Sequence, residues 1–167
     1  MIVQIRVDDR LIHGQVALVW SKELNTPGII VANDEAANNE TVKMTLKMAT
    51  PSGIKLLVRS VDDAVGVFNN EKAKTMRIFA LTRNMKDTLK LVENCRNNIE
   101  TVNVANVGRF DPTDISEKVA LVGNTVLLNH DEIEATKKIV ELMGDNVYRQ
   151  LIPTNAKTPI SKLLKKL

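Results

Sequence analysis

Short apolar runs alternate along the chain with stretches in which apolar residues recur every three or four positions. Continuous runs of this length are typical of buried β-strands, and the wider spacing is typical of amphipathic α-helices. Five strands are predicted in this way, at residues 2–7, 27–34, 50–60, 76–82 and 99–107. Stretches with helical spacing follow the first four, so strands and helices alternate over this part of the chain.

Helices are predicted in the intervals between these strands. Their apolar stripes consist of Val16, Val19, Trp20 and Leu24 in the first helix (14–24), of Val42, Leu46 and Ala49 in the second, and of Met85, Leu89, Val92 and Cys95 in the last. A shorter helix is expected near 61–70. Because parallel neighbours need a crossover connection, the alternation indicates a parallel sheet with helices on both faces.

The alternation changes in the last third of the chain. A loop with short strands, a helix and a late strand are expected there, at 108–128, 131–143 and 146–153. The tail begins with the helix-start signals Thr158 and Pro159 and continues with an apolar face opposite lysines. A short basic amphipathic tail of this kind is more often docked on its own domain than bound to a membrane surface. With no repeat and no evident linker, we expect one α/β domain over residues 1–167.

The composition narrows the class of protein. Hydrophobic residues make up 44% and charged residues 26%, which is ordinary for a single soluble domain of 167 residues. Aromatic residues are only 3%, which argues against a stacking platform for single-stranded nucleic acid. No apolar run approaches the ~20 residues that cross a bilayer, and charge appears too early for a signal peptide. A lone Cys95 excludes an internal disulfide and fits a reducing cytoplasm.

The stretch VDDRLIHGQV, residues 7–16, lies between the first predicted strand and the first predicted helix. In an open parallel sheet, ligands bind outside the carboxyl ends of the strands. His13 stands just before the helix, whose N–H groups from about Gly14 and Gln15 would point toward an anion, and Gly14 would let a ligand approach the backbone. Arg10 could contact phosphate oxygens with two nitrogens. An imidazole nucleophile, a helix end and a guanidinium together indicate phosphoryl transfer.

Other charged residues near this loop leave alternatives open. Asp8 and Asp9 could form a carboxylate pair for acid–base chemistry or for Mg²⁺, or one could orient a neighbouring basic side chain while the other caps the turn. Arg6 lies inside a strand that is expected to be buried, so it needs a partner. Either an aspartate or a bound phosphate would serve.

The remaining reactive side chains favour structural roles. His130 lies in a helix-start context and is predicted to be a surface or capping residue. Cys95 falls on an apolar helix stripe and is predicted to be inert. Two histidines far apart and one cysteine do not form a zinc site, and the GxGxxG and GxxxxGK[ST] patterns are missing from the sequence. These patterns therefore indicate no metal and no nucleotide cofactor.

The string IRVDDRLIHGQV closely resembles the phosphorylation-site loop of the mannose-class (mannose/fructose/sorbose) IIB components of the bacterial phosphoenolpyruvate:sugar phosphotransferase system. The similarity continues in the family's order through IIVANDEAA, TLKMATPSGIKLLVRSVDDAV, IFALTRNMKD, VNVANVG and DEIEATKKI. It covers roughly residues 1–165, which is essentially a whole IIB unit. The Asp-Arg-Leu-Ile-His-Gly-Gln string is far more specific than a lone histidine.

The resemblance implies a phosphocarrier. His13 would accept a phosphoryl group, on its Nδ1 nitrogen, from a phosphohistidine of a separate IIA protein. It would pass that group to a sugar during uptake through the membrane IIC/IID complex, and the transient phosphohistidine would need no cofactor. Arg10, Gly14 and Gln15 match the family's loop. The protein would be cytoplasmic, would meet the membrane only through IIC/IID, would bind no nucleic acid and would be compatible with a homodimer.

The family fold is a mainly parallel, seven-stranded twisted sheet with helices on both faces. By this resemblance, the loops after the second, fourth and fifth strands border the site around Asp34, Thr82 and Asn106. From their place next to the loop, Arg6 and Asp9 are expected to support the site. The chain departs from the family where Ala105 and Asn106 replace two glycines found in many members. These glycines would allow close backbone approach, so the geometry of that wall is open.

Two other functions remain open at this point. The first is a stand-alone phosphatase or nucleotide-dependent transferase that uses the same histidine without a partner protein. The second is a non-catalytic module whose mildly basic surface, with a formal net charge of +3, binds an acidic protein or nucleic acid. The transported sugar is not indicated, because specificity in this family resides largely in the membrane subunits.

Overall fold

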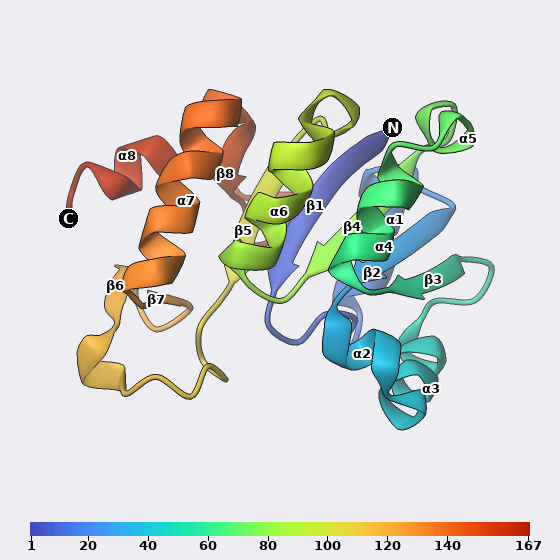
Figure 1. Cartoon of the computed structure of the whole chain (residues 1–167), viewed down its shortest axis with the longest axis horizontal. Coiled ribbons are helices and arrows are strands. Elements are labelled where there is room, and N and C mark those ends of the chain that lie inside the picture. The colour runs from blue at the N-terminus through green and yellow to red at the C-terminus, as the bar shows by residue number, and fades with distance from the viewer.

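A seven-stranded sheet forms the centre of the protein in a computed structural model that describes residues 1–167 (Figure 1). Its strands are β1 (Ile2–Asp8), β2 (Gly28–Ala32), β3 (Lys55–Arg59), β4 (Ile78–Thr82), β5 (Val102–Asn106), β8 (Val147–Arg149) and β9 (Thr158–Pro159). In space they follow the order β3-β2-β4-β1-β5-β8-β9. All neighbours are parallel except β9, which pairs antiparallel with β8. The mainly parallel sheet that the sequence predicts is therefore confirmed.

Eight α-helices accompany the sheet. They are α1 (Val16–Glu23), α2 (Asp34–Asn38), α3 (Glu40–Ala49), α4 (Val61–Phe68), α5 (Glu71–Lys74), α6 (Met85–Cys95), α7 (His130–Met143) and α8 (Ile160–Leu164). One face of the sheet is covered by α4, α6 and α7, which lie in front of it in Figure 1 and share a core of 26 buried residues. On the other face, residues of α1, α2 and α3 pack with residues of β2, β4 and the loop after β1 in a second core of 10 residues. None of these helices combines the length and the apolar character that spanning a bilayer requires.

Six of the helices begin after a polar side chain that accepts a hydrogen bond from their first turn. These capping residues are Asn33, Asn39, Ser60, Asn70, Asn84 and Asn129, ahead of α2 to α7 in that order. Such an oxygen satisfies one of the N–H groups that a helix start leaves unpaired. Asn39 has extended backbone angles (φ −128°, ψ 108°), which is why the segment after β2 forms two helices and not the single one predicted.

The packing corrects and extends the predicted pattern in a few places. Val19 does not face the core, because α1 buries Ala17, Trp20 and Ser21 and leaves Val19 43% exposed. The short strands expected after β5 form a separate antiparallel hairpin of β6 (Val119–Val122) and β7 (Val126–Leu128). The tail docks on its own domain as predicted, since Ile160 of α8 is fully buried.

The connections around β1 leave toward opposite faces of the sheet. β1 leads to α1 on one face, whereas its neighbour β4 leads to α6 on the other. Where neighbouring connections diverge in this way, the carboxyl ends of the strands border a crevice in which ligands bind. The loop after β1 begins at this place, so the fold positions it as a candidate site.

Candidate active site

His13 lies at the rim of the protein in the loop between β1 and α1, with its side chain 22% exposed. Two residues earlier the chain makes a tight turn, in which the Leu11 N–H donates to the Asp8 carbonyl at 2.9 Å and Leu11 has a φ of +56°. This turn drives Leu11 and Ile12 into the core beneath α1, where they are 2% and 5% exposed. The two aliphatic side chains therefore anchor the loop and hold the imidazole at its surface.

The imidazole has a defined orientation in this structure. Its Nδ1 atom lies 3.4 Å from the carbonyl oxygen of Leu11 and 4.0 Å from Oδ1 of Asp8. A ring nitrogen beside a carbonyl carries its proton there, which leaves the other nitrogen as the basic one. In this orientation Nδ1 faces the loop.

Asp8 is the centre of a buried polar cluster behind His13. Its carboxylate is fully buried, accepts hydrogen bonds from the Arg10 N–H (3.1 Å) and Asn106 Nδ2 (3.2 Å), and lies 3.5 Å from Nε of Arg6. Arg6 is 1% exposed and stacks on Trp20 at 5.2 Å from the ring centroid. Burial lowers the pKa of the Arg6 guanidinium, and the charge of Asp8 opposes that shift. Of the two partners considered for Arg6, the structure therefore provides the aspartate.

Asp9 ties the loop after β1 to the segment after β5. Its carboxylate accepts three hydrogen bonds from Arg109, two from the guanidinium (2.8 and 3.3 Å) and one from the backbone N–H (3.2 Å). The hydrogen bonds between the guanidinium and the Asp9 carboxylate raise the pKa of Arg109. Arg109 is missing from the residues predicted from sequence, where its only signal is its place just after the fifth strand.

The groups that remain available to an anion lie on the outer side of the loop. Arg10 is exposed, and its guanidinium forms no hydrogen bond or ion pair within the protein. Only its backbone N–H is hydrogen-bonded, to the Asp8 carboxylate. α1 begins after Gln15, whose side chain does not cap it, in contrast to the six capped helices. Gly14 has a φ of +48°, and a Cβ there would have no atom within 4 Å. Glycine is therefore favoured at this position by the backbone conformation of the turn, and the space beside Gly14 is open.

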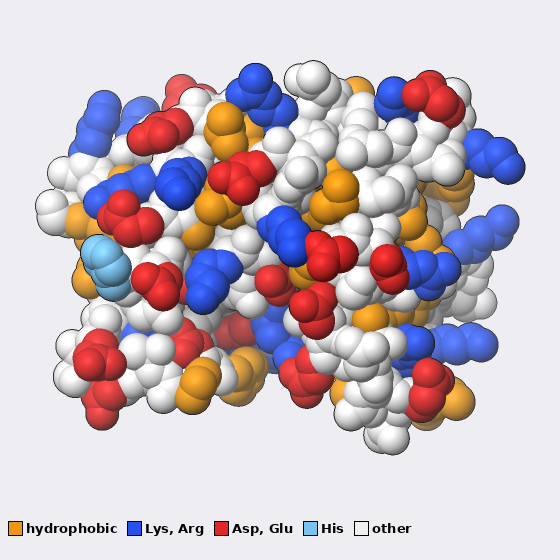
Figure 2. Space-filling model, viewed as in Figure 1, with side chains coloured by type: hydrophobic (Ala, Val, Ile, Leu, Met, Phe, Trp, Pro, Cys, Tyr) orange, Lys and Arg blue, Asp and Glu red, His pale blue; other side chains and the backbone are white.

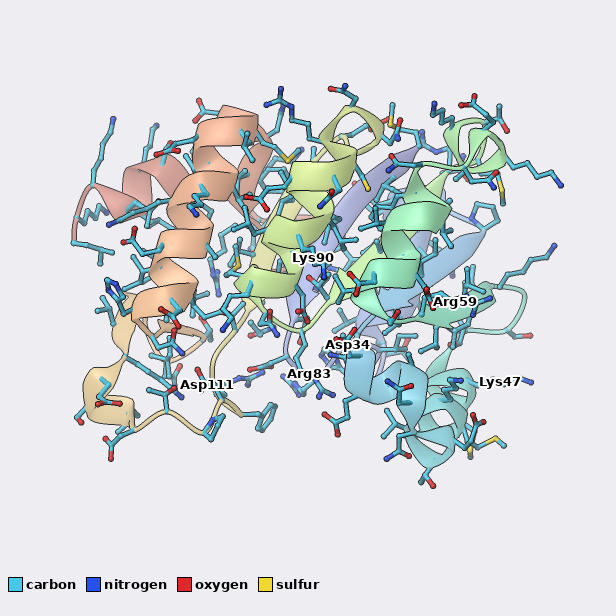
Figure 3. The ribbon with its side chains drawn as sticks, viewed as in Figure 1. Asp34, Lys47, Arg59, Arg83, Lys90 and Asp111 are labelled. Carbon is cyan, nitrogen blue, oxygen red and sulfur yellow. The ribbon has the colours of Figure 1, made fainter.

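The three residues predicted to border the site are used differently. Asn106 is buried and donates a hydrogen bond to Asp8, which links the end of β5 to the loop after β1. Thr82 is fully buried, with its hydroxyl 2.7 Å from that of Thr88. Asp34 accepts a hydrogen bond from the Val61 N–H at 2.9 Å and so links α2 to α4. Figure 3 shows Asp34 at the lower edge of the sheet near Arg83, which forms an ion pair with Glu35.

The other reactive side chains lie apart from this loop. His130 is exposed at the first turn of α7, as its sequence context predicts. Cys95 is buried, and burial raises the pKa of its thiol, which keeps it protonated. No three His, Cys, Asp or Glu side chains are grouped so as to hold a metal ion. The candidate chemistry is therefore that of His13, in a loop that also carries Arg10 and leads into the uncapped start of α1.

Comparisons with known proteins show the family to which the chain belongs. The family model of the sorbose subfamily IIB component of the phosphotransferase system matches residues 2–167. A probable phosphotransferase enzyme IIB component of Streptococcus pyogenes is 51% identical over 164 residues, which are 98% of this chain and 99% of that protein. The mannose-specific EIIAB component of Escherichia coli (strain K12) is 34% identical over 162 residues, 97% of this chain and 48% of that protein.

The fold agrees as well. The solved IIB domain of the sorbose permease from Klebsiella pneumoniae superposes with a TM-score of 0.85 at 31% identity, covering 99% of this chain and 97% of that one. The chain therefore belongs to the sorbose subfamily of phosphotransferase-system IIB components, a family of phosphotransfer proteins of sugar uptake.

Proposed function

We propose that His13 accepts a phosphoryl group from a phosphorylated IIA protein and passes it to a sugar entering through a membrane IIC/IID complex, on the cytoplasmic side. The observation that carries the proposal is a half-buried imidazole in the same short loop as an exposed arginine whose guanidinium has no partner in the protein. The E. coli relative supports the choice of donor, because its name joins an A unit and a B unit in one component.

The transfer needs little covalent chemistry from the protein. A ring nitrogen of His13 attacks phosphorus with its lone pair, an N–P bond forms, and the bond between phosphorus and the donor's imidazole breaks with its electron pair going to the donor. In the second step a sugar hydroxyl attacks, the N–P bond breaks, and the hydroxyl proton is released. Arg10 and the first N–H groups of α1 would neutralise the phosphoryl oxygens in both steps.

The resemblance assigns the attack to Nδ1, and the resting orientation bears on that assignment. A phosphoryl group on Nδ1 would lie in the ring plane, where the Leu11 carbonyl oxygen is 3.4 Å away. Attack through Nδ1 therefore requires the ring to turn away from Leu11 and Asp8. The side chain is exposed enough at the rim to make that turn without unpacking the core, because Leu11 and Ile12 supply the anchoring contacts.

A labelling experiment tests the proposal. The wild-type chain is incubated with phosphoenolpyruvate, the general phosphotransferases and a cognate IIA protein. The labelled residue is then mapped by mass spectrometry of peptides that are kept at alkaline pH, where phosphohistidine is stable. We expect one acid-labile phosphate on His13, with ¹⁵N–³¹P coupling to Nδ1. Label on any other residue would refute the proposal, as would turnover of free phosphoesters without a partner protein. Label on Nε2 would show that the ring keeps its resting orientation.

Arg10 gives a second prediction. Arg10→Gln should lower the rate of phosphoryl transfer to His13 about 100-fold, because it removes a charged donor from the developing charge on the phosphoryl oxygens. The measurement is single-turnover transfer from labelled IIA. Arg96→Gln is the matched control, since Arg96 is exposed before the amino end of β5, away from the loop, and should leave the rate unchanged. Equal rates for Arg10→Gln and wild type would contradict the role.

A further inference from the structure

The segment between β5 and β6 is held in place by polar side chains. Lys118 Nζ donates to the carbonyl oxygens of Gly108 (2.7 Å) and Asp111 (2.9 Å), and Asn129 Nδ2 donates to Oδ2 of Asp111 (2.9 Å) and to Oγ1 of Thr113 (3.2 Å). Gly108 has a φ of +91°, and a Cβ there would lie 1.7 Å from the carbonyl oxygen of Leu127. The backbone is therefore fixed by polar bonds, a close contact and the burial of Val107, without help from the apolar side chains of Phe110, Pro112 and Ile115.

Those apolar side chains point into solvent. Phe110 is 66% and Ile115 is 73% exposed, and Pro112 between them is exposed as well. The contrast with the rest of the chain is large, because all four other aromatic residues are buried: Trp20, Phe68, Phe79 and Tyr148. We call Phe110, Pro112 and Ile115 the Phe110 patch. An aromatic side chain presented on an ordered loop loses little conformational freedom on binding, which is a property of interface hot spots.

The Phe110 patch is joined to the loop that carries His13. The Arg109 guanidinium lies 5.5 Å from the centroid of the Phe110 ring, and it binds Asp9, which stands four residues before His13. Phe110 and Pro112 also line a cleft of about 320 Å³ together with Asp9, Arg83 and Lys86. A protein that brings a phosphohistidine to His13 must cover more than the imidazole, since specific interfaces bury about 800 Å² on each partner. Such a contact would extend onto the patch.

The charges around the patch indicate what it fits. On the segment itself Arg109 forms an ion pair with Asp9 and Lys118 is bound by carbonyl oxygens, whereas the carboxylates of Asp111, Asp114 and Glu117 form no ion pair. Figure 2 shows acidic and hydrophobic side chains together along the lower border beneath α7, and Figure 3 places Asp111 on this segment. An acidic border repels an anionic lipid surface and favours a partner with basic side chains.

We propose that the Phe110 patch docks the phosphoryl donor, through an apolar socket on the donor that is bordered by lysine or arginine side chains. The proposal rests on the proposed function of His13 and names the surface that the donor uses. It implies that Phe110 acts on recognition of the donor and leaves the reactivity of His13 unchanged.

Two phosphoryl sources separate recognition from chemistry. Transfer to Phe110→Ala and Ile115→Ala variants is measured from phosphorylated IIA and, in parallel, from phosphoramidate, which is too small to touch the patch. We expect kcat/KM from IIA to fall about tenfold or more for Phe110→Ala, through KM, and the phosphoramidate rate to equal that of wild type. Met48→Ala is the matched control, because Met48 is 80% exposed on α3 and should leave both rates unchanged.

A charge reversal tests the chemistry of the partner. Glu117→Lys should also raise KM for phosphorylated IIA, and added salt should weaken the wild-type interaction but change little in the variant. If wild type accepts phosphate from IIA and Phe110→Ala does so with the same kcat/KM, the docking proposal is wrong while the function of His13 stands. A Phe110→Ala defect confined to onward transfer to the sugar would likewise overturn it. If neither source phosphorylates wild-type His13, the proposed function itself fails.

Discussion

Replacing His13 with glutamine should reduce phosphate transfer from IIA to the protein by about 1,000-fold or more, to background. The reason is that the relay passes through a covalent bond to an imidazole nitrogen, and a glutamine amide offers no nucleophilic nitrogen in its place. The variant should remain folded, because the side chain is partly exposed and its polar contacts are the long approaches of Nδ1 to the Leu11 carbonyl (3.4 Å) and to Asp8 (4.0 Å). Labelling by phosphorylated IIA, followed by quantification of protein-bound phosphate, gives the measurement.

His130 provides the matched control for this experiment. It is the only other histidine, is exposed at the start of α7, and lies in a different part of the fold. His130→Gln should accept phosphate at the wild-type rate. Residual labelling of His13→Gln at the wild-type level would mean that another residue carries the phosphate, and loss of labelling in both variants would point to an indirect effect.

Removal of the Asp8 carboxylate should cause the largest loss of stability among single substitutions at the site. Asp8→Ala removes the counter-charge of the Arg6 guanidinium, which is buried with only 1% of the residue exposed. It also removes the acceptor of the hydrogen bonds that Asn106 and the Arg10 N–H donate. Breaking a buried ion pair from one side typically costs about 3–5 kcal/mol of the free energy of unfolding. Urea denaturation followed by circular dichroism would show this as a lower midpoint with an unchanged slope.

A paired replacement identifies the cause. In an Arg6→Met, Asp8→Ala double variant no unpaired charge remains, so most of the lost stability should return, because replacing both members of a buried pair is often close to neutral. Asp62→Ala serves as the exposed control, since its ion pair with Lys90 is on the surface and its loss should hardly move the midpoint. A double variant as unstable as Asp8→Ala would show that the carboxylate acts by holding the loop, independently of Arg6.

The elements of the fold could be predicted because each is encoded locally. β1, β4 and β5 are buried along their whole length and most of their residues are apolar, so they could be recognised in the sequence as strands, and the helices between them show apolar stripes. Where the prediction is wrong, the cause is also physical. Asn39 ends one helix and caps the next, and the rotation of α1 that exposes Val19 is set by how Ala17 and Trp20 pack.

At the candidate site, too, residues that are close in the sequence could be predicted, whereas the partners of two buried charges could not. His13, Arg10 and the open start of α1 are neighbours in the chain, so the sequence by itself determined the string that carries the proposed chemistry, its place after the first strand, and the family. The partners of Arg6 and Asp9 were decided only by the tertiary structure. Arg6 pairs with Asp8 of its own strand, and Asp9 with Arg109, which is 100 residues away. Local periodicity reports which residues are buried, whereas the Asp9–Arg109 pair forms because β5 lies beside β1 in the sheet, which no local pattern of the sequence reports.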